Sequence, residues 1–278
     1  MGAPQLLEGI LKTIDKYKLV KKNDKIYVGL SGGKDSAVAL YSLVEYSKKI
    51  NAEIKGFFIK FADFQEDMEK IVKKQAKKFN VELRIFDVRN EINLTEIAKK
   101  SSRPICSVCG IIRRYLINKL PREEKATKVA TGHHGDDFIV FFLKNIAGRN
   151  FFYSSKFTPL LKSNHEKLLP KIRPLFFNSE KEIKEICKEL SIPLYHEVIC
   201  PFIKVKRKLD KNREKLYRVV WQLDEIKEFK KQFLAGMIEL SKILEDGEKP
   251  KTCKLCGEPT SLEICGVCNL KRKMEKIL

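Results

Sequence analysis

A short apolar run that enters a polar, glycine-containing turn constrains this chain more than any other feature. Residues 26–30 read Ile-Tyr-Val-Gly-Leu, as expected of a buried strand. The turn that follows consists of Ser31, Gly32, Gly33, Lys34, Asp35 and Ser36. Helical periodicity then runs from residue 37 to residue 50. A strand, a glycine turn and a helix in this order predict half of a βαβ unit, in which the start of the helix offers N–H groups to an anion.

The strand–helix alternation continues along the chain. Further strands are predicted over residues 54–59, 81–88 and 127–131, and helices over 6–20, 66–79 and 179–190. Residues 149–170 have no clear periodicity and are expected to form an irregular, mobile loop. The alternation predicts an α/β fold, a parallel sheet with helices on both faces. Ligands of such folds bind at the carboxyl ends of the strands.

A second polar turn follows the strand predicted over residues 127–131. It reads Gly132-His133-His134-Gly135-Asp136-Asp137 and should reach the same sheet edge as the first turn. Its carboxylates suit Mg²⁺ between phosphate oxygens, and either Asp136 or Asp137 is a candidate for proton abstraction. The residue pattern does not choose between the two. Zinc binding by His133 and His134 is the alternative interpretation.

The charge predicts a polyanionic partner. The chain has 56 Lys+Arg and 36 Asp+Glu, a formal net charge of +20. Residues 204–218 hold eight of the basic residues and only two acidic ones. Tyr217 and Trp221 lie in or beside this segment, and a basic segment with aromatic side chains is typical of nucleic-acid binding. A basic surface without a specific partner is the alternative. A long helix is predicted over 224–244, followed by a linker at 245–250.

The eight cysteines indicate metal or redox chemistry, because the sequence shows no export signal that would favour disulfides. Cys106 and Cys109 precede a helix predicted over residues 111–120, and Cys200 is followed by Pro201. A redox pair or a three-cysteine zinc site would also fit these three thiols. Cys187 falls on a predicted helix and is expected to be a buried structural thiol.

The C-terminal cysteines form the pattern C-x₂-C-x₈-C-x₂-C. Four thiolates at this spacing suit tetrahedral zinc in a closed structural site, so a small zinc-knuckle module is predicted. A second iron–sulfur site is the alternative. The predicted zinc ligands are Cys253, Cys256, Cys265 and Cys268.

Taken together, SGGKDS after an apolar strand, C-x-x-C-G before a basic helix, the GHHGDD turn and the distant Cys-Pro resemble the PP-loop ATP family, in its iron–sulfur-dependent tRNA 2-thiolation branch. The resemblance implies that Ser31–Ser36 and Gly132 bind ATP, which is cleaved to AMP and pyrophosphate. It implies a [4Fe–4S] cluster on Cys106, Cys109 and Cys200, with one iron open to sulfide. Asp136 or Asp137 would then assist adenylation of the C2 oxygen of a tRNA pyrimidine. Phe138 departs from the family pattern, which usually has Glu or Gln there.

The resemblance also sets expectations for organisation and partners. Residues 1–200 would form the ATP-binding catalytic domain, 201–249 a basic helical RNA-binding extension and 250–278 the zinc module. Uridine is favoured over cytidine, and the sulfur donor would be sulfide or a sulfur-carrier protein. A homodimer, a cytoplasmic location and no membrane contact are expected. Two other functions stay open: a PP-loop ligase or amidotransferase that adenylates a small substrate, and a non-enzymatic zinc-containing RNA-binding protein.

Overall fold

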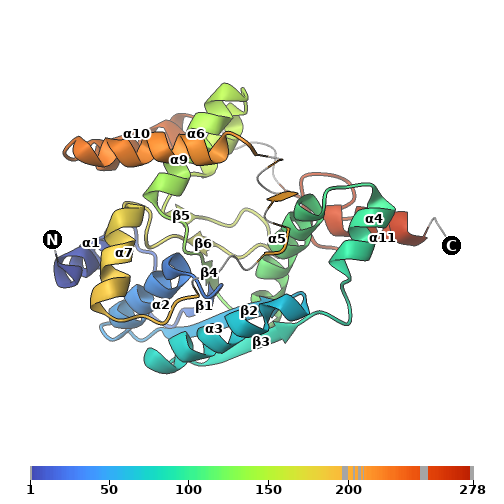
Figure 1. Cartoon of the computed structure of the whole chain (residues 1–278), viewed down its shortest axis with the longest axis horizontal. Coiled ribbons are helices and arrows are strands. Elements are labelled where there is room, and N and C mark those ends of the chain that lie inside the picture. The colour runs from blue at the N-terminus through green and yellow to red at the C-terminus, as the bar shows by residue number, and fades with distance from the viewer. Residues whose placement is uncertain are drawn as a thin grey trace.

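A six-stranded sheet forms the centre of the molecule (Figure 1). The computed structural model describes residues 2–195, 200–202, 204, 205, 208, 210–244 and 250–275. The strands are ordered β3-β2-β1-β4-β6-β5; all neighbours are parallel except β5 and β6. Their bounds are β1 Lys25–Gly29, β2 Glu53–Lys60, β3 Leu83–Asp87, β4 Lys128–Ala130, β5 Leu160–Leu161 and β6 Lys171–Ile172.

Alternation of side chains along the strands builds two separate cores. Ile26 and Val28 of β1 point to one face of the sheet, whereas Tyr27 points to the other. The first face is covered by α1 (Ala3–Lys16), α2 (Lys34–Ser47), α3 (Glu66–Lys78) and α7 (Glu180–Glu189). The second is covered by α4 (Leu94–Ser101), α5 (Ile105–Glu123) and α11 (Gly266–Glu275). Both faces are therefore buried, as a parallel sheet requires.

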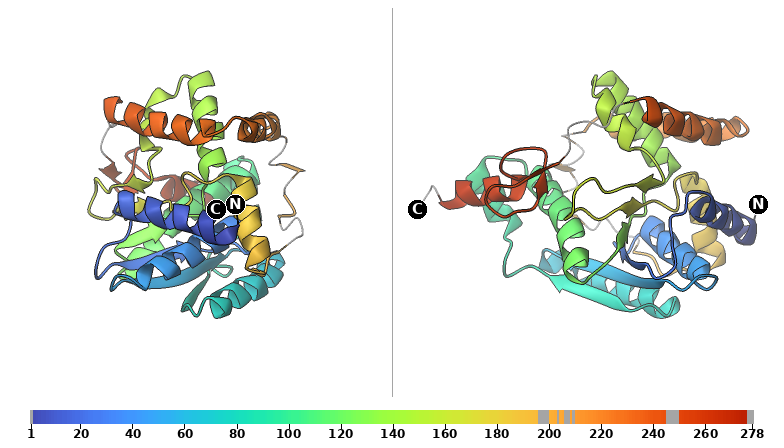
Figure 2. Two further views of the ribbon diagram at one scale, coloured as in Figure 1. Left: turned by 90° about the vertical axis from the view of Figure 1, so that its left-hand side faces the viewer. Right: turned by 180° about the vertical axis from the view of Figure 1, so that it is seen from behind.

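A third helical layer lies above the sheet, where Figures 1 and 2 show α6 and α10 as a pair of long helices. It consists of α6 (Gly135–Ala147), α9 (Arg213–Gln222) and α10 (Phe229–Ile243), which share a buried apolar cluster. Short 3₁₀ turns accompany them: η2 (Phe151–Lys156) and η3 (Leu223–Glu225). A further turn, η1 (Asp63–Gln65), precedes α3.

The small C-terminal module consists of α11 and a two-stranded ribbon, β7 (Lys251–Thr252) and β8 (Pro259–Thr260). It packs on the second face of the sheet. Leu270 of α11 is buried in that core, and Arg122 of α5 binds both carboxylate oxygens of Glu258. Because this pair is shielded from solvent and bidentate, it holds the module on α5 more firmly than an exposed pair would.

The predicted fold class, a parallel α/β sheet with helices on both faces, is confirmed. The differences are local. The irregular segment at 149–170 contains η2 and the antiparallel strand β5, and the long helix expected from residue 224 begins only at Phe229 because Glu228 takes a left-handed conformation. Parts of the predicted basic segment (206, 207 and 209) and linker (245–249) lie outside the described residues. Within the described ranges, no helix has the length and apolar character needed to span a bilayer.

Candidate functional site

The first polar turn closes on itself between β1 and α2. The Ser36 hydroxyl accepts from the Ser31 backbone N–H at 3.2 Å and donates to the Gly33 carbonyl at 3.1 Å. Gly32 has a φ of +75°, a left-handed conformation that favours glycine. The buried Gln75 of α3 donates to the Gly32 carbonyl at 3.2 Å and supports the turn from below. The turn therefore presents the N-terminus of α2, with its positive dipole end, at the carboxyl edge of the sheet.

The second polar turn lies directly against the first. A Cβ atom on Gly132 would stand 2.6 Å from the backbone of both Asp35 and Ser36, so only glycine allows this approach. His134, which is 3% exposed, then lies between two carboxylates. Its Nε2 is 3.8 Å from Asp35 and 3.7 Å from Asp137. The close approach at Gly132 thus gathers a histidine and two acids at one sheet edge.

The structure separates the two aspartates of this turn. Asp136 is completely buried, accepts a hydrogen bond from Lys230 at 2.7 Å and another from the Glu180 N–H at 2.9 Å. It ties α6 to α7 and α10. Asp137 instead lines the cavity beside the first turn. Burial raises the pKa of Asp137, but His134 and the hydroxyl that Tyr217 donates to it outweigh burial, so the pKa is lowered and the carboxylate is charged at neutral pH.

The cavity has a volume of about 490 Å³ and lies at the carboxyl ends of β1, β2 and β4. This volume suits a nucleotide-sized ligand. Ser31, Asp35, Ser36, Gly132 and Asp137 all line it. Apolar side chains form part of the remaining wall, namely Leu30, Phe57, Ile59, Phe61, Met68 and Ile117.

Lys34 departs from the arrangement expected of a phosphate ligand. Its ammonium lies 3.0 Å from Asp35 and 3.6 Å from Glu180 of α7, and it is not among the residues that line the cavity. Burial lowers the pKa of Lys34, but the two carboxylates outweigh burial and raise it. The lysine is therefore charged and held between the first turn and α7.

Two arginines complete the cavity from distant parts of the chain. Arg113 of α5 lines the cavity. Its guanidinium lies 5.6 Å from the centre of the Phe61 ring, and its Nη2 is 3.9 Å from the Cys109 sulfur. Arg213 of α9 also lines the cavity and donates to the Tyr217 hydroxyl at 3.3 Å. Sequence reasoning placed Tyr217 in an RNA-binding segment and did not connect Arg213 with the nucleotide site. The tertiary fold, not the local sequence, brings α9 over the cavity.

One of the core cysteines, Cys109, contacts Arg113, which lines this cavity. The α5 helix begins at Ile105, earlier than predicted, because Pro104 occupies the position before its first turn. Cys106 thus lies in the first turn of α5 and Cys109 at the start of the second. The Cys106 sulfur is 3.8 Å from the Phe202 carbonyl, so the segment that carries Cys200 reaches the start of this helix. All three thiols are half-buried, and none of them forms a disulfide.

The three core cysteines are half-buried thiols, a donor type that iron–sulfur clusters use. Among the described residues, the only group of three or more Cys, His or acidic ligand atoms within 4.8 Å of one another is the C-terminal one, so neither the core cysteines nor His133 and His134 gather around one ion. Thiolates of a four-iron cluster each bind a different iron and stand further apart than the ligands of one zinc ion.

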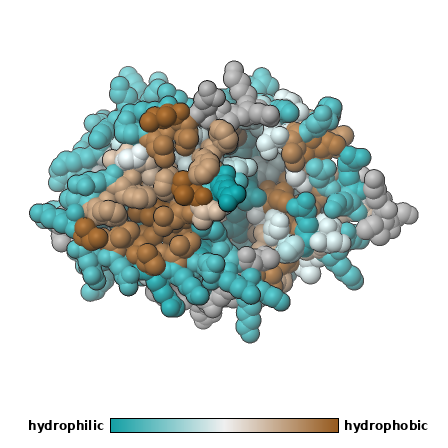
Figure 3. Space-filling view, turned by 90° about the horizontal axis from the view of Figure 1, so that it is seen from above, coloured by the Kyte–Doolittle hydropathy of each residue, from teal (hydrophilic) through white to brown (hydrophobic). Residues whose placement is uncertain are grey.

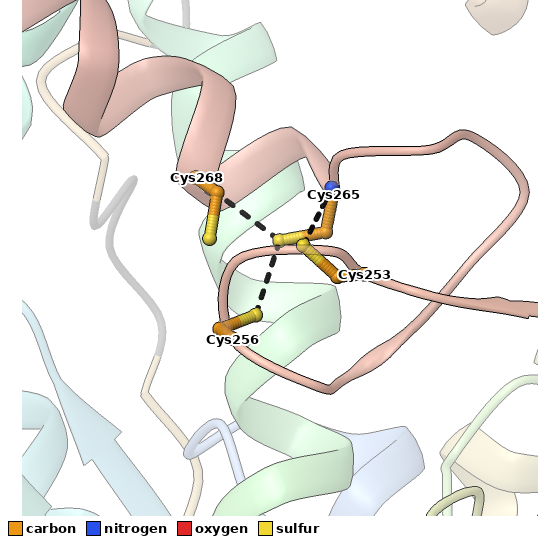
Figure 4. Close-up of side chains that lie close together, drawn as sticks. All are labelled: Cys253, Cys256, Cys265 and Cys268. Carbon is orange, nitrogen blue, oxygen red and sulfur yellow. Dashed lines mark hydrogen bonds between the residues drawn. The ribbon is translucent and has the colours of Figure 1, made fainter.

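The four C-terminal sulfurs converge on one point (Figure 4). Cys256 and Cys265 sulfurs are 3.7 Å apart, close to the edge of about 3.8 Å that a tetrahedron with Zn–S bonds of about 2.3 Å would have. Backbone N–H groups of Cys265 and Cys268 point at the sulfurs of Cys253 and Cys265, at 3.2 and 3.4 Å. N–H donors around sulfur stabilise thiolates. The donor set therefore fits zinc.

The comparisons with known proteins agree with the fold. A PP-loop domain model matches residues 5–198, which places the chain in the PP-loop class of proteins. A tRNA-5-methyluridine(54) 2-sulfurtransferase from Thermotoga maritima is 34% identical, over 95% of this chain and 86% of the relative. Its counterpart from Pyrococcus horikoshii is 33% identical, over 93% of this chain and 82% of the relative.

Two further matches are informative. A tRNA-cytidine(32) 2-sulfurtransferase 2 from Francisella tularensis is 31% identical over 70% of this chain and 72% of the relative. The solved U34-tRNA thiolase NcsA from Methanococcus maripaludis, with its [4Fe-4S] cluster, superposes with a TM-score of 0.78, 26% identity and coverage of 98% of this chain and 89% of NcsA. The chain belongs to the PP-loop family and, within it, to the tRNA 2-sulfurtransferases.

Substitution of Gly132 by alanine should weaken ATP binding about tenfold or more, because the new Cβ forces apart the two turns that line the cavity. Such overpacking costs about 1–3 kcal/mol, and about 1.4 kcal/mol corresponds to tenfold in affinity. Gly236→Ala on α10 is the matched control, since its Cβ meets nothing within 4 Å. Calorimetric titration with ATP measures both. Equal affinity of Gly132→Ala and the parent chain would show that the turns do not need this contact.

Proposed function

We propose that this chain uses ATP to replace the C2 oxygen of a tRNA uridine with sulfur, and that the uridine is the 5-methyluridine at position 54. One observation carries the proposal. Arg113 lines the cavity beside the phosphate turn and reaches the Cys109 sulfur at 3.9 Å, so a nucleotide site and a thiol site share one side chain. Relatives that act on uridine 54 match 93–95% of the chain, whereas the cytidine(32) relative matches only 70%.

The chain's own residues provide the activation step. The first turn and the N-terminus of α2 hold the phosphates of ATP, with the hydroxyl of Ser31 as an additional donor. The C2 oxygen of the uridine attacks the α-phosphorus, pyrophosphate leaves, and the oxygen becomes part of an AMP ester. Arg113 and Arg213 offset the negative charge that develops on the phosphoryl oxygens. Asp137, charged and facing the cavity, is the candidate to orient the uridine; Asp136 is committed to Lys230.

Sulfur transfer completes the reaction. Sulfide attacks C2, and AMP leaves with the former C2 oxygen. A [4Fe–4S] cluster on Cys106, Cys109 and Cys200 would supply an open iron at which sulfide is bound. Arg113 links this thiol site to the cavity, because its guanidinium contacts Cys109 and also faces the nucleotide.

The remaining assignments extend this proposal. Asp35 and Asp137, on either side of His134, would supply oxygen ligands to Mg²⁺. The four C-terminal cysteines would bind zinc. We propose residues 1–200 as the catalytic domain, 201–249 as an RNA-binding extension and 250–278 as the zinc module. Sulfide or a sulfur-carrier protein as donor, a homodimer and a cytoplasmic location, where tRNA is found, complete the proposal.

Nucleoside mass spectrometry of tRNA from cells that lack the protein tests the function. We expect loss of 2-thiolated 5-methyluridine and its return on expression of the chain. Loss of a thiolated wobble uridine or of thiocytidine would move the target to that position. Unchanged nucleosides, combined with ATP–pyrophosphate exchange in the absence of RNA, would instead support an adenylating ligase; tRNA binding without AMP release would support a non-enzymatic RNA-binding protein.

Replacement of Cys200 by serine should lower the rate of sulfur transfer about 100-fold or more and remove iron from the anaerobically purified protein. The loss of a metal ligand lowers affinity and activity at least as much as the loss of a residue that hydrogen-bonds a ligand. Affinity for ATP should not change. Cys187→Ala is the control for iron content, because Cys187 is buried in α7. Iron analysis and anaerobic sulfur transfer are the measurements. Full iron content and activity in Cys200→Ser would refute the cluster assignment.

Replacement of Tyr217 by phenylalanine should move the acid limb of the pH profile of kcat/KM to higher pH. The Tyr217 hydroxyl donates a hydrogen bond to Asp137 and stabilises the charged carboxylate. Removal of this hydroxyl therefore raises the pKa of Asp137, so that a larger fraction of Asp137 is protonated at a given low pH. Activity at neutral pH should change little. Trp221→Phe, whose ring centre lies 6.0 Å from that of Tyr217, is the control. An unshifted limb would exclude Asp137 as the titrating group.

A further inference from the structure

A group of cations outside the nucleotide cavity has no acidic partner. Lys171 lies on β6, and Arg173 follows the strand; both are half-buried. Arg114 of α5 and Lys156 of η2 are exposed nearby. Throughout the part of the chain that the structure describes, none of these four side chains forms an ion pair.

The lack of partners is unusual within this protein. Its other buried lysines are each paired with acids: Lys60 with Glu69, Lys128 with Asp24 and Lys230 with Asp136. Burial lowers the pKa of Lys171, and the charges of Arg173, Arg114 and Lys156 lower it further. A half-buried cation among three others is electrostatically unfavourable. An anion bound between them would remove that cost.

Arg173 has a different part in the group. It donates to the carbonyls of Lys156 and Thr158, at 2.6 and 2.8 Å, and its guanidinium lies 4.9 Å from the centre of the Phe138 ring. It therefore fixes the segment that carries Lys156. Lys171, Arg114 and Lys156 have no such side-chain hydrogen bonds to other described residues, so their donors are available to a ligand.

Two hollows meet at Lys171. One, of about 460 Å³, lies between α5 and the C-terminal module and is also lined by Arg103, Arg114 and Lys273. The other, of about 360 Å³, lies between α6 and η2 and is also lined by Tyr153 and Lys156. Seen from above, the molecule is hollowed near its centre, between the helical layer and the C-terminal module (Figure 3). Cations thus line both hollows on either side of Lys171, and the acid in the first hollow, Glu258, is paired with Arg122.

This group of cations lies beside the nucleotide cavity. Arg114 directly follows Arg113, which lines the cavity. Phe141 lies in the wall of the second hollow. The centre of its ring is 6.2 Å from that of His133 and 5.8 Å from the Arg213 guanidinium. His133 and Arg213 both line the nucleotide cavity. A chain of phosphates on the cations could therefore place one nucleotide at the cavity.

The η2 turn adds surface aromatic side chains. Phe151, Phe152 and Tyr153 are 45%, 63% and 59% exposed. Lys156 lies 5.3 Å from the centre of the Tyr153 ring. Exposed aromatic rings beside lysines are suited to unpaired bases, which stack on the rings while the lysines contact the phosphates.

We propose that Lys171, Arg114 and Lys156 form a binding site for backbone phosphates of the tRNA, with the aromatic side chains of η2 as the stacking surface for a neighbouring base. The site deepens the proposed function, on which it rests only for the identity of the RNA. An acidic carrier protein would use the same charges, but the exposed rings favour a nucleic acid.

The test is equilibrium binding of unmodified tRNA to the anaerobically prepared full chain across a series of salt concentrations. Lys171→Gln should weaken binding roughly fivefold at 0.15 M salt and reduce the salt slope by about 1, the signature of one lost phosphate contact. Lys156→Gln, at an exposed position where folding is not at stake, should act in the same direction. Lys12→Gln is the control: it removes the same charge from an exposed pair with Glu8 on α1. ATP affinity should be unchanged in all three.

The outcomes separate this site from the proposed function. Lys171→Gln and Lys156→Gln with the parent affinity and slope would overturn the phosphate site, whether or not the chain transfers sulfur. A weakening equal to that of Lys12→Gln would overturn it too, because it would reflect net charge alone. If both variants lose tRNA affinity and the parent chain transfers no sulfur, the phosphate site holds and the proposed reaction fails.

Discussion

The contact between two backbone turns at Gly132 is the constraint on which the site depends. No side chain fits where this glycine meets Asp35 and Ser36. The contact brings the N-terminus of α2 and the first turn of α6 to one sheet edge, with His134 between two carboxylates. The proposed phosphate site and Asp137 are therefore positioned by rigid elements, and neighbours that offset the burial of Asp137 maintain its charge.

The α5 helix connects this nucleotide site with the thiols. Cys109 and Arg113 lie one turn apart on it, and the arginine faces both the sulfur and the cavity. On its other side the helix packs in the core beneath the sheet, through Val108 and Ile112. A helix fixed in this way keeps Cys106 and Cys109 at a constant distance from the cavity.

The sequence predicts the sheet, both polar turns and the cysteine pairs, because each depends on local periodicity or spacing. It does not separate Asp136 from Asp137, since their difference arises from Lys230, which lies far along the chain. The sequence also does not distinguish Arg213 from the other cations of its basic segment. Its place at the cavity depends on the packing of α9 over that cavity. The short strand β5 has too few residues for a periodic signal. The sequence alone does not provide the tertiary contacts, which decide which side chains face the cavity and which residues they contact.

The attachment of the C-terminal module to α5 has a consequence for how such a module can be exchanged. Leu270 belongs to the same core as the helix that carries Cys106 and Cys109, and Glu258 is held by Arg122 of that helix. The C-terminal module is therefore an integral part of the fold around α5. A chimaera that grafts a foreign zinc ribbon here would need to bring its own docking leucine and acid, or else leave an apolar hole and an unpaired arginine under the helix that presents the thiols.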